Sequence, residues 1–138
     1  MPVTRLAEKF GTPLYVYSAQ TLRARFAEYE RAFARQPHTV CYSVKANSNL
    51  ALLRLLSAEG AGFDVVSGGE LERVLRVGKQ AAKRVVFSGV GKTAVELDLA
   101  LRADVLLFNL ESEAELELLA SRAAALKKIA RVAFRVNP

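Results

Sequence analysis

The sequence predicts an α/β fold in which strands and helices alternate around a parallel sheet. Three observations support this prediction. Short apolar runs alternate with stretches of helical length, the connections between them are short, and three of the helical stretches begin with a capping pattern directly after a strand. The runs at 85–87 and 105–108 also lack alternating polar residues, which is typical of strands buried on both faces.

Residues 1–20 are expected to form a lead-in segment with a short strand, ahead of the repeating units. Residues 1–11 are interpreted as a short helix or an irregular stretch that ends at Gly11, before Thr12 and Pro13. Residues 14–17 are predicted to form the strand, because aromatic and β-branched residues favour extended structure.

A helix is predicted from Ser18, which can cap it, to about Arg35, with Pro37 ending it. Its large apolar residues recur at steps of four, three and four and would form one stripe: Leu22, Phe26, Tyr29 and Phe33.

From residue 37 onward the chain repeats a strand–helix unit. Strands are predicted at 40–44, 63–66, 85–88, 105–108 and 132–136. Helices are predicted near 50–59, 69–77, 94–102 and 113–127. The capping pattern, a Ser or Thr followed three residues later by Glu, occurs at Ser67 with Glu70, at Thr93 with Glu96, and at Ser112 with Glu115.

Two architectures fit such a run: a doubly wound open sheet, or part of an eight-stranded barrel. The residue pattern alone does not distinguish between them. A complete barrel typically needs about 250 residues, whereas this chain of 138 residues supplies five strands after residue 37. If the chain is a barrel, we expect it to be cut short after about five strands.

The composition indicates a soluble globular protein, with 51% hydrophobic and 25% charged residues. No apolar run approaches the roughly 20 residues of a membrane span, and the first residues lack the apolar core of a signal peptide, so the expected location is cytoplasmic and no membrane partner is expected. The net charge of +6 is spread along helical stretches, which argues against nucleic-acid binding. The single Cys41 and the single His38 argue against a disulfide, a metal site or a catalytic triad.

Lys45 is the first candidate for chemistry. It follows an apolar strand and precedes a cluster of turn-forming residues, in which Ser48 or Asn49 can cap the next helix. Alternation along the strand would place Lys45 on the same, more polar face as Cys41 and Ser43. The carboxyl ends of strands are where α/β proteins place their active sites, although a lysine there can also extend its ammonium group into water.

Asp64 and Arg135 are candidates because each lies in an apolar strand, where an unpaired charge is costly. Each could instead belong to a structural ion pair, Arg135 with an acid on a neighbouring strand. Ser67 and Glu70 are explained by helix capping, and a role at a site is secondary for them.

Residues 89–93 end like a phosphate-binding loop that precedes a helix. That loop requires a glycine five positions before Gly91, where this sequence has Val86. A nucleotide-binding function is therefore disfavoured, and Lys92 is expected to be a solvated loop lysine.

Residues 42–47, Tyr-Ser-Val-Lys-Ala-Asn, resemble the cofactor-lysine motif of the pyridoxal-phosphate decarboxylases of the alanine racemase-like barrel superfamily. Five further segments resemble, in the same order, segments of the diaminopimelate decarboxylase family: 10–17, 62–71, 87–93, 108–113 and 135–138. The resemblance favours the barrel, and it implies a partial (β/α)8 TIM barrel, incomplete and binding pyridoxal 5'-phosphate, over residues 21–138.

The resemblance implies an enzyme, a carbon–carbon lyase that removes carbon dioxide from meso-diaminopimelate to give L-lysine and acts as a homodimer at full length. Lys45 would hold the cofactor as a Schiff base and later donate a proton, and Asp64, Arg135, Ser67 and Glu70 would lie around the cofactor. Other family segments, including the glycine-rich phosphate loop, have no counterpart in the chain, so it is expected to be inactive alone. The alternatives are a related decarboxylase that acts on arginine, ornithine or carboxynorspermidine, and a non-catalytic binding domain of the same fold.

Overall fold

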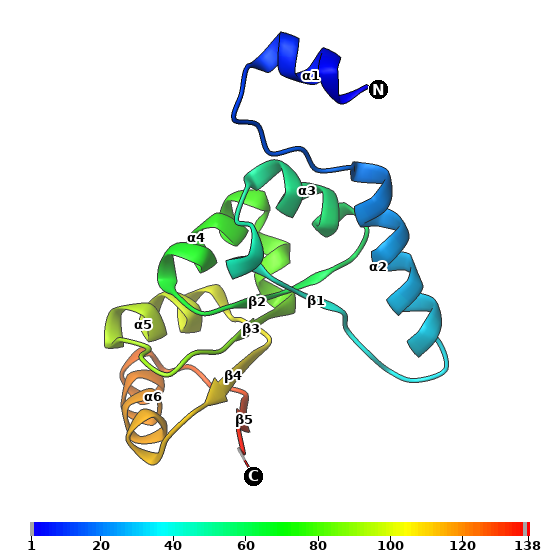
Figure 1. The fold of residues 1–138 in the computed structure, drawn as a ribbon. Coiled ribbons are helices and arrows are strands. Elements are labelled where there is room, and N and C mark those ends of the chain that lie inside the picture. Colours follow the sequence, from blue (N-terminus) through cyan, green and yellow to red (C-terminus); the bar gives the residue numbers. More distant parts are fainter. Residues whose placement is uncertain (1, 137) are drawn as a thin grey trace.

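The chain folds into a five-stranded sheet with helices packed along one face (Figure 1). The computed structural model describes residues 2–136 and 138. The strands are β1 (Cys41–Ser43), β2 (Gly62–Val65), β3 (Val85–Phe87), β4 (Leu107–Leu110) and β5 (Val132–Phe134). The helices are α1 (Val3–Phe10), α2 (Ala19–Phe33), α3 (Leu50–Ala58), α4 (Gly68–Val77), α5 (Ala94–Ala103) and α6 (Glu113–Leu126), with 3-10 turns η1 (Val44–Ala46) and η2 (Lys79–Arg84). The predicted order of strands and helices after residue 37 is confirmed.

The order of the strands distinguishes between the two predicted architectures. All five strands are parallel, and they lie side by side in the order of the sequence, β1-β2-β3-β4-β5. A doubly wound sheet would reverse its strand order at a switch point, and the described sheet has no reversal. Consecutive helices from α2 to α6 also contact one another in sequence order. The fold is therefore a partial (β/α)8 barrel.

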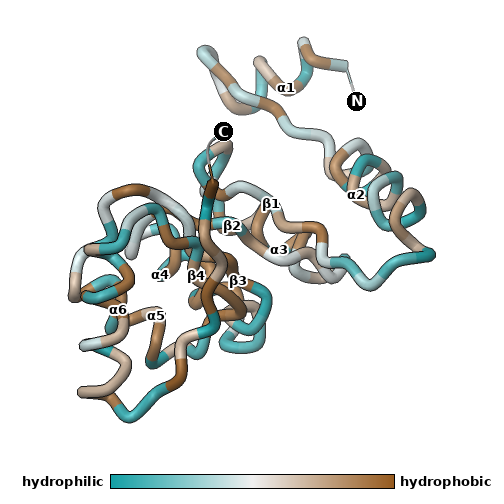
Figure 2. Tube along the Cα trace, turned by 90° about the horizontal axis from the view of Figure 1, so that it is seen from below, coloured by the Kyte–Doolittle hydropathy of each residue, from teal (hydrophilic) through white to brown (hydrophobic). Residues whose placement is uncertain are grey.

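The two faces of the sheet differ in polarity. One face carries residues that are at most 2% exposed and that form a single core with the helices: Phe63, Val65, Val85, Phe87, Phe108 and Leu110. This core contains the stacked rings of Phe87 and Phe108, whose centroids are 6.3 Å apart, and Figure 2 shows the hydrophobic stretches gathered along β3 and β4. The other face is half-buried and includes Asp64 and Asn109.

The strands are thus not buried on both faces within the described chain, contrary to the prediction for 85–87 and 105–108. Val86 and Leu107 lie on the half-buried face, because alternation sends every second side chain away from the helices. Strand β4 also begins two residues later than predicted, since Val105 and Leu106 belong to the connection after α5.

Residues 2–18 lie apart from the strands of the sheet (Figure 1). Helix α1, which ends at Gly11, confirms the predicted lead-in helix, but none of its residues is buried. The predicted strand at 14–17 is wrong: these residues are extended but pair with no strand in the described chain, and Tyr15 is 88% exposed. Strand-favouring residues form a strand only where a partner accepts their backbone hydrogen bonds.

Helix α2 begins as predicted, with the Ser18 side chain accepting a hydrogen bond from the Thr21 amide at 3.2 Å. Its apolar stripe is only partly covered, because Phe26 is buried whereas Tyr29 and Phe33 are 58% and 50% exposed. None of the helices in the described chain is long and apolar enough to cross a membrane.

Candidate active site at the carboxyl ends of the strands

A row of hydrogen-bonded polar side chains crosses the half-buried face of the sheet near the carboxyl ends of the strands. Ser43 Oγ donates to Asp64 Oδ2 at 3.5 Å, and Ser88 Oγ donates to Asp64 Oδ1 at 2.6 Å. Asn109 Nδ2 in turn donates to Ser88 Oγ at 2.9 Å. Strand register explains the row: Ser43 pairs with Asp64, and in parallel strands residues in register point to the same face.

Asp64 is the centre of this row. Its strand neighbours Phe63 and Val65 are fully buried, so the carboxylate is the one polar group that β2 sends to the other face. Asp64 forms no ion pair with any residue that the structure describes, so the predicted structural ion pair is wrong for this part of the chain. Two hydroxyl donors hold it instead, and a carboxylate retains lone pairs for a further donor.

Cys41 lies beside this row on the same face of the sheet. The pKa of its thiol is raised, first by burial and then by the negative charge of Asp64. The thiol therefore stays protonated at neutral pH and is a small packing group.

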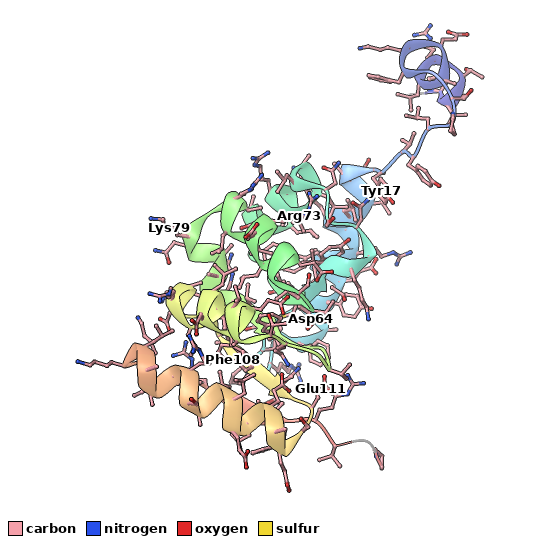
Figure 3. All side chains as sticks on the ribbon, turned by 90° about the vertical axis from the view of Figure 1, so that its left-hand side faces the viewer. Tyr17, Asp64, Arg73, Lys79, Phe108 and Glu111 are labelled. Atoms are coloured by element: carbon pink, nitrogen blue, oxygen red, sulfur yellow. The ribbon has the colours of Figure 1, made fainter. Side chains whose placement is uncertain are left out.

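Glu111 and Arg135 continue the polar row beyond the ends of β4 and β5. Glu111 Oε1 accepts a hydrogen bond from the Gly89 amide at 3.2 Å and lies 3.4 Å from Arg135 Nη1. The side chain of Glu111 is 8% exposed and that of Arg135 is 54% exposed. The ion pair expected as the alternative role of Arg135 is therefore present, with an acid that directly follows the neighbouring strand. In Figure 3, Asp64 and Glu111 lie toward the same end of the sheet, and Lys79 lies toward the opposite end.

Lys45 lies two residues after Ser43, the last residue of β1 in register with Asp64. The strand ends earlier than predicted, because η1 begins at Val44, whose side chain is fully buried. Lys45 itself is exposed, and its amine makes no hydrogen bond or ion pair with a residue between 2 and 136 or with residue 138. An unpaired amine thus stands at the carboxyl end of β1.

The loop after Lys45 is held by short-range hydrogen bonds. Tyr42 Oη donates to the Asn47 carbonyl at 3.2 Å, and Asn47 Oδ1 accepts from the Asn49 amide at 2.9 Å. Asn49 Oδ1 accepts from the Ala51 amide at 2.9 Å, so Asn49 is the predicted cap of α3. The backbone on both sides of Lys45 is therefore held by hydrogen bonds, from Tyr42 to Asn47 and from Asn49 to Asn47.

Ser67 and Glu70 have the capping role that the sequence predicts. Ser67 Oγ accepts a hydrogen bond from the Glu70 amide at 3.3 Å at the start of α4. The Glu70 carboxylate accepts from the Val66 amide at 2.9 Å, one residue earlier than in a reciprocal capping box. Neither side chain bonds to the polar row in the described chain. Of the three predicted boxes only that of Thr93 and Glu96 is reciprocal.

The prediction of a solvated Lys92 is wrong. Its side chain is 1% exposed, and Nζ donates to Glu115 Oε1 at 2.6 Å, to the Asn109 carbonyl at 2.7 Å and to the Gly89 carbonyl at 2.9 Å. The loop between β3 and α5 folds over the end of β4, and this buries the lysine. No local pattern predicts this burial, because the ionic partner is 23 residues away in the sequence.

Four residues of the polar row were not identified as site candidates from the sequence: Ser43, Ser88, Asn109 and Glu111. A signal was present, since each is a polar residue at or just after the end of a successive apolar strand. These residues can be identified as neighbours only when the register of the strands is known, because register decides which of their side chains share a face of the sheet.

Comparisons with known proteins agree with this geometry. The profile of the family described as "Pyridoxal-dependent decarboxylase, pyridoxal binding domain" matches residues 19–138. Diaminopimelate decarboxylase of Pseudomonas aeruginosa is 54% identical to the chain, over 99% of the chain and 32% of the relative. The crystal structure of diaminopimelate decarboxylase from Helicobacter pylori complexed with L-lysine is 40% identical, with a TM-score of 0.93 over 99% of the chain and 34% of that protein.

A more distant solved structure, lysine decarboxylase from Selenomonas ruminantium, is 27% identical with a TM-score of 0.83, over 97% of the chain and 33% of that protein. The chain thus spans about a third of the length of the relatives that it matches. The family profile covers most of the chain, and the solved structures share its strand and helix arrangement. The chain therefore belongs to the family of pyridoxal-dependent decarboxylases, and the match falls on their pyridoxal-binding domain.

Proposed function

We propose that this chain forms the amino-terminal part of the cofactor-binding barrel of an enzyme that decarboxylates meso-diaminopimelate to L-lysine. The observation that carries the proposal is a contrast in similarity: 54% identity to a diaminopimelate decarboxylase, against 27% to a lysine decarboxylase of the same fold. This contrast favours a diaminopimelate decarboxylase over a lysine decarboxylase, and the alternatives that act on arginine, ornithine or carboxynorspermidine are left to the substrate test below.

The side chains at the carboxyl ends of the strands fit pyridoxal phosphate as a cofactor. Lys45 offers an exposed primary amine, Asp64 a carboxylate held by hydroxyl groups, and Arg135 a half-exposed guanidinium. An amine can react with an aldehyde, and a carboxylate can accept a hydrogen bond from a positively charged or polar N–H group. A guanidinium can stack on an aromatic ring or pair with an anion.

Lys45 would hold the cofactor through its amine. When bound, pyridoxal phosphate supplies an aldehyde and a ring that accepts the electrons of the bond that breaks. An aldehyde is attacked by the lone pair of an unprotonated amine, which is the role that this side chain would have. Lys45 is attached to a backbone fixed by the Tyr42 and Asn49 hydrogen bonds, so only side-chain torsions need to be ordered.

Asp64 would act as an orienting acceptor beside the amine and the cofactor. Its position is fixed by Ser43 and Ser88, and Ser88 is fixed in turn by Asn109. Arg135, whose guanidinium is oriented by Glu111, would contact the cofactor from the last strand of the described sheet. Ser67 and Glu70 would contribute through the loop between β2 and α4 that they shape.

Two broader proposals follow from the family. The whole protein is proposed to be a homodimer in the cytoplasm, and residues 21–138 are proposed to be the cofactor-binding unit, preceded by the lead-in segment 1–20. In the described sheet, β1 and β5 each pair with one strand only, and the further strands of a complete barrel would cover both edges. Light scattering on the natural gene product measures the oligomeric state, and a monomeric mass would contradict the dimer.

The cofactor proposal is tested by incubating the chain with pyridoxal phosphate, reducing it with borohydride and mapping the labelled peptide. We expect the label on Lys45, less label in Asp64→Asn, and none at this position in Lys45→Ala. Lys79 and Lys127 are exposed lysines of the same chain and serve as internal controls. Label spread evenly over the exposed lysines, or no label, would favour the non-catalytic binding domain.

The substrate proposal is tested on the natural gene product by measuring carbon dioxide release. We expect release from meso-diaminopimelate and little from arginine, ornithine or carboxynorspermidine. Preference for one of the latter three would leave the cofactor assignment intact and reject the substrate.

A further inference from the structure

We propose that Lys92 and Glu115 are a positioning pair, which holds the carboxyl ends of β3 and β4 in the arrangement that the candidate active site requires. Counted over the whole residue, backbone included, they are the buried charged residues among those that the structure describes, at 7% and 9% exposure. Neither belongs to the polar row itself. The part of this inference that concerns the cofactor rests on the proposed function, and the part that concerns the protein does not.

The ammonium group of Lys92 has all of its hydrogen-bonding capacity used. Its three N–H groups meet three acceptors, the Glu115 carboxylate and the carbonyls of Gly89 and Asn109, at 2.6 to 2.9 Å. Its Nζ also lies 5.7 Å from the centre of the Phe87 ring. One side chain thus joins the loop after β3, the end of β4 and the start of α6.

The carboxylate of Glu115 is shared in the same way. One oxygen accepts from Lys92 and the other accepts from the Glu111 amide at 2.8 Å. The Glu115 amide is itself bonded to the Ser112 side chain at 3.2 Å, which fixes the start of α6. The pair therefore controls the backbone at both ends of the short connection between β4 and α6.

The residues held by this pair are those that touch the candidate site. Glu111, whose amide is held by Glu115, orients Arg135 and accepts from the Gly89 amide. Asn109, whose carbonyl is held by Lys92, donates to Ser88, which donates to Asp64. Loosening the pair should thus displace Arg135 and Asp64 without removing any atom that contacts either of them.

A purely structural role does not explain why this pair is buried. A buried ion pair often stabilises a protein no better than apolar residues of similar volume. The same two segments are also joined at the surface, where Arg122 of α6 pairs with Asp98 of α5. What apolar residues could not provide is the hydrogen bonds from Lys92 to the carbonyls of Gly89 and Asn109, and the one from the Glu111 amide to Glu115.

The test compares three proteins: the original chain, the variant with Lys92→Met and Glu115→Met, and a matched control with Asp98→Asn and Arg122→Gln. Amide hydrogen exchange of Gly89 is the main measurement, because this amide bonds to Glu111 and to neither substituted residue. We expect exchange about tenfold faster in the first variant, the factor that corresponds to losing one hydrogen bond to a charged group, and unchanged exchange in the control.

Denaturant unfolding separates positioning from packing. The inference is supported if the variant with Lys92→Met and Glu115→Met has the same free energy of unfolding as the original chain while its Gly89 amide exchanges faster. If Gly89 stays protected, the pair is only a packing element and the inference is wrong. Should the double variant not fold, Glu115→Gln, which keeps the volume and removes the charge, is measured against the same criteria.

Cofactor trapping at Lys45 gives a second measurement. We expect the yield of borohydride-trapped label to fall about tenfold in the double variant, in step with the lost hydrogen bonding, and to stay unchanged in the control. Equal trapping in all three proteins would contradict a role toward the site. If the original chain traps no cofactor, the proposed function fails, and the exchange of Gly89 still decides whether the pair positions the loop.

Discussion

The two ends of the sheet carry ionic networks of similar composition in different surroundings. At the amino ends of the strands, Asp104 pairs with Lys83 and, at 2.9 Å, with Arg131, and these side chains are 42%, 49% and 50% exposed. At the carboxyl ends, the side chains of Lys92 and Glu115 are 1% and 8% exposed. Each network ties consecutive units together, one in water and one inside the protein.

The difference indicates what each network contributes. An exposed pair is weakened by water and by salt, so it mainly tightens the connections between a helix and the next strand. A buried pair has few competing partners and dictates the positions of the groups around it. Barrels of this type place chemistry at the carboxyl ends and stability at the amino ends, and the burial of these networks follows the same division.

The largest effect is expected from Lys92→Met, which leaves Glu115 as an unpaired buried charge. We expect the free energy of unfolding to fall by about 3–5 kcal/mol, measured by urea unfolding. The matched change at the amino end is Lys83→Met, where the partner Asp104 stays in water and keeps Arg131. If Lys92→Met and Lys83→Met lowered the free energy of unfolding equally, the proposed difference between the buried and the exposed network would be wrong.

A smaller effect is expected from Gly68→Ala at the start of α4. A methyl group there would lie 2.9 Å from Cγ of Glu96, whose carboxylate is held by the Gly68 amide at 2.7 Å and the Thr93 amide at 2.9 Å. Because Glu96 cannot move away freely, we expect a loss of about 2 kcal/mol in unfolding free energy. Gly91→Ala, which meets nothing within 4 Å, should be near neutral. In a Glu96→Ala background the cost of Gly68→Ala should largely disappear.

Glu96 also gives the carboxyl end a pH dependence that salt does not screen. Its pKa lies below the ordinary 4.5, first because the Gly68 amide and then because the Thr93 amide donate to its carboxylate. The stability from this shift is complete above pH 4.5 and is lost as the pH falls through the lower folded-state pKa. Glu96→Gln should cost about 1 kcal/mol at pH 7 and flatten the acid limb of the stability–pH curve.

The smallest effect is expected from Asp104→Asn at the amino end. The pKa of Asp104 is lowered from 3.8, first by Lys83 and then by Arg131. Its contribution is therefore also present above pH 3.8 and lost as the pH falls through the folded-state pKa. In contrast to that of Glu96, it should shrink in 1 M salt, because its partners are exposed cations. Thermal unfolding at low and high salt measures this, and a salt-independent effect would contradict the assignment.

Elements that depend on nearby residues were predictable from the sequence. Asn49, Ser67, Thr93 and Ser112 cap the helices that their positions indicate, because a cap and its amide partner lie two or three residues apart. The absence of a strand at 14–17 was not predictable from composition, since a strand forms only where a partner strand elsewhere in the chain pairs with it.

The candidate site was predictable in part. Asp64 and Arg135 were identified because a charge within an apolar strand needs an explanation, and both belong to the polar row. The hydroxyl groups of Ser43 and Ser88, which hold Asp64, and the amide of Asn109, which holds Ser88, are uncharged and carry no such signal. The burial of Lys92 depends on Glu115 and could be predicted only from the folded chain.

The glutamate at the third position of α5 and of α6 binds its own loop with one oxygen and the preceding unit with the other. Glu96 reaches back to the Gly68 amide, and Glu115 reaches back to Lys92. A chimera that exchanges a single strand–helix unit with a relative would therefore separate a glutamate from its partner. Recombination within this barrel is expected to succeed when it transfers adjacent units together.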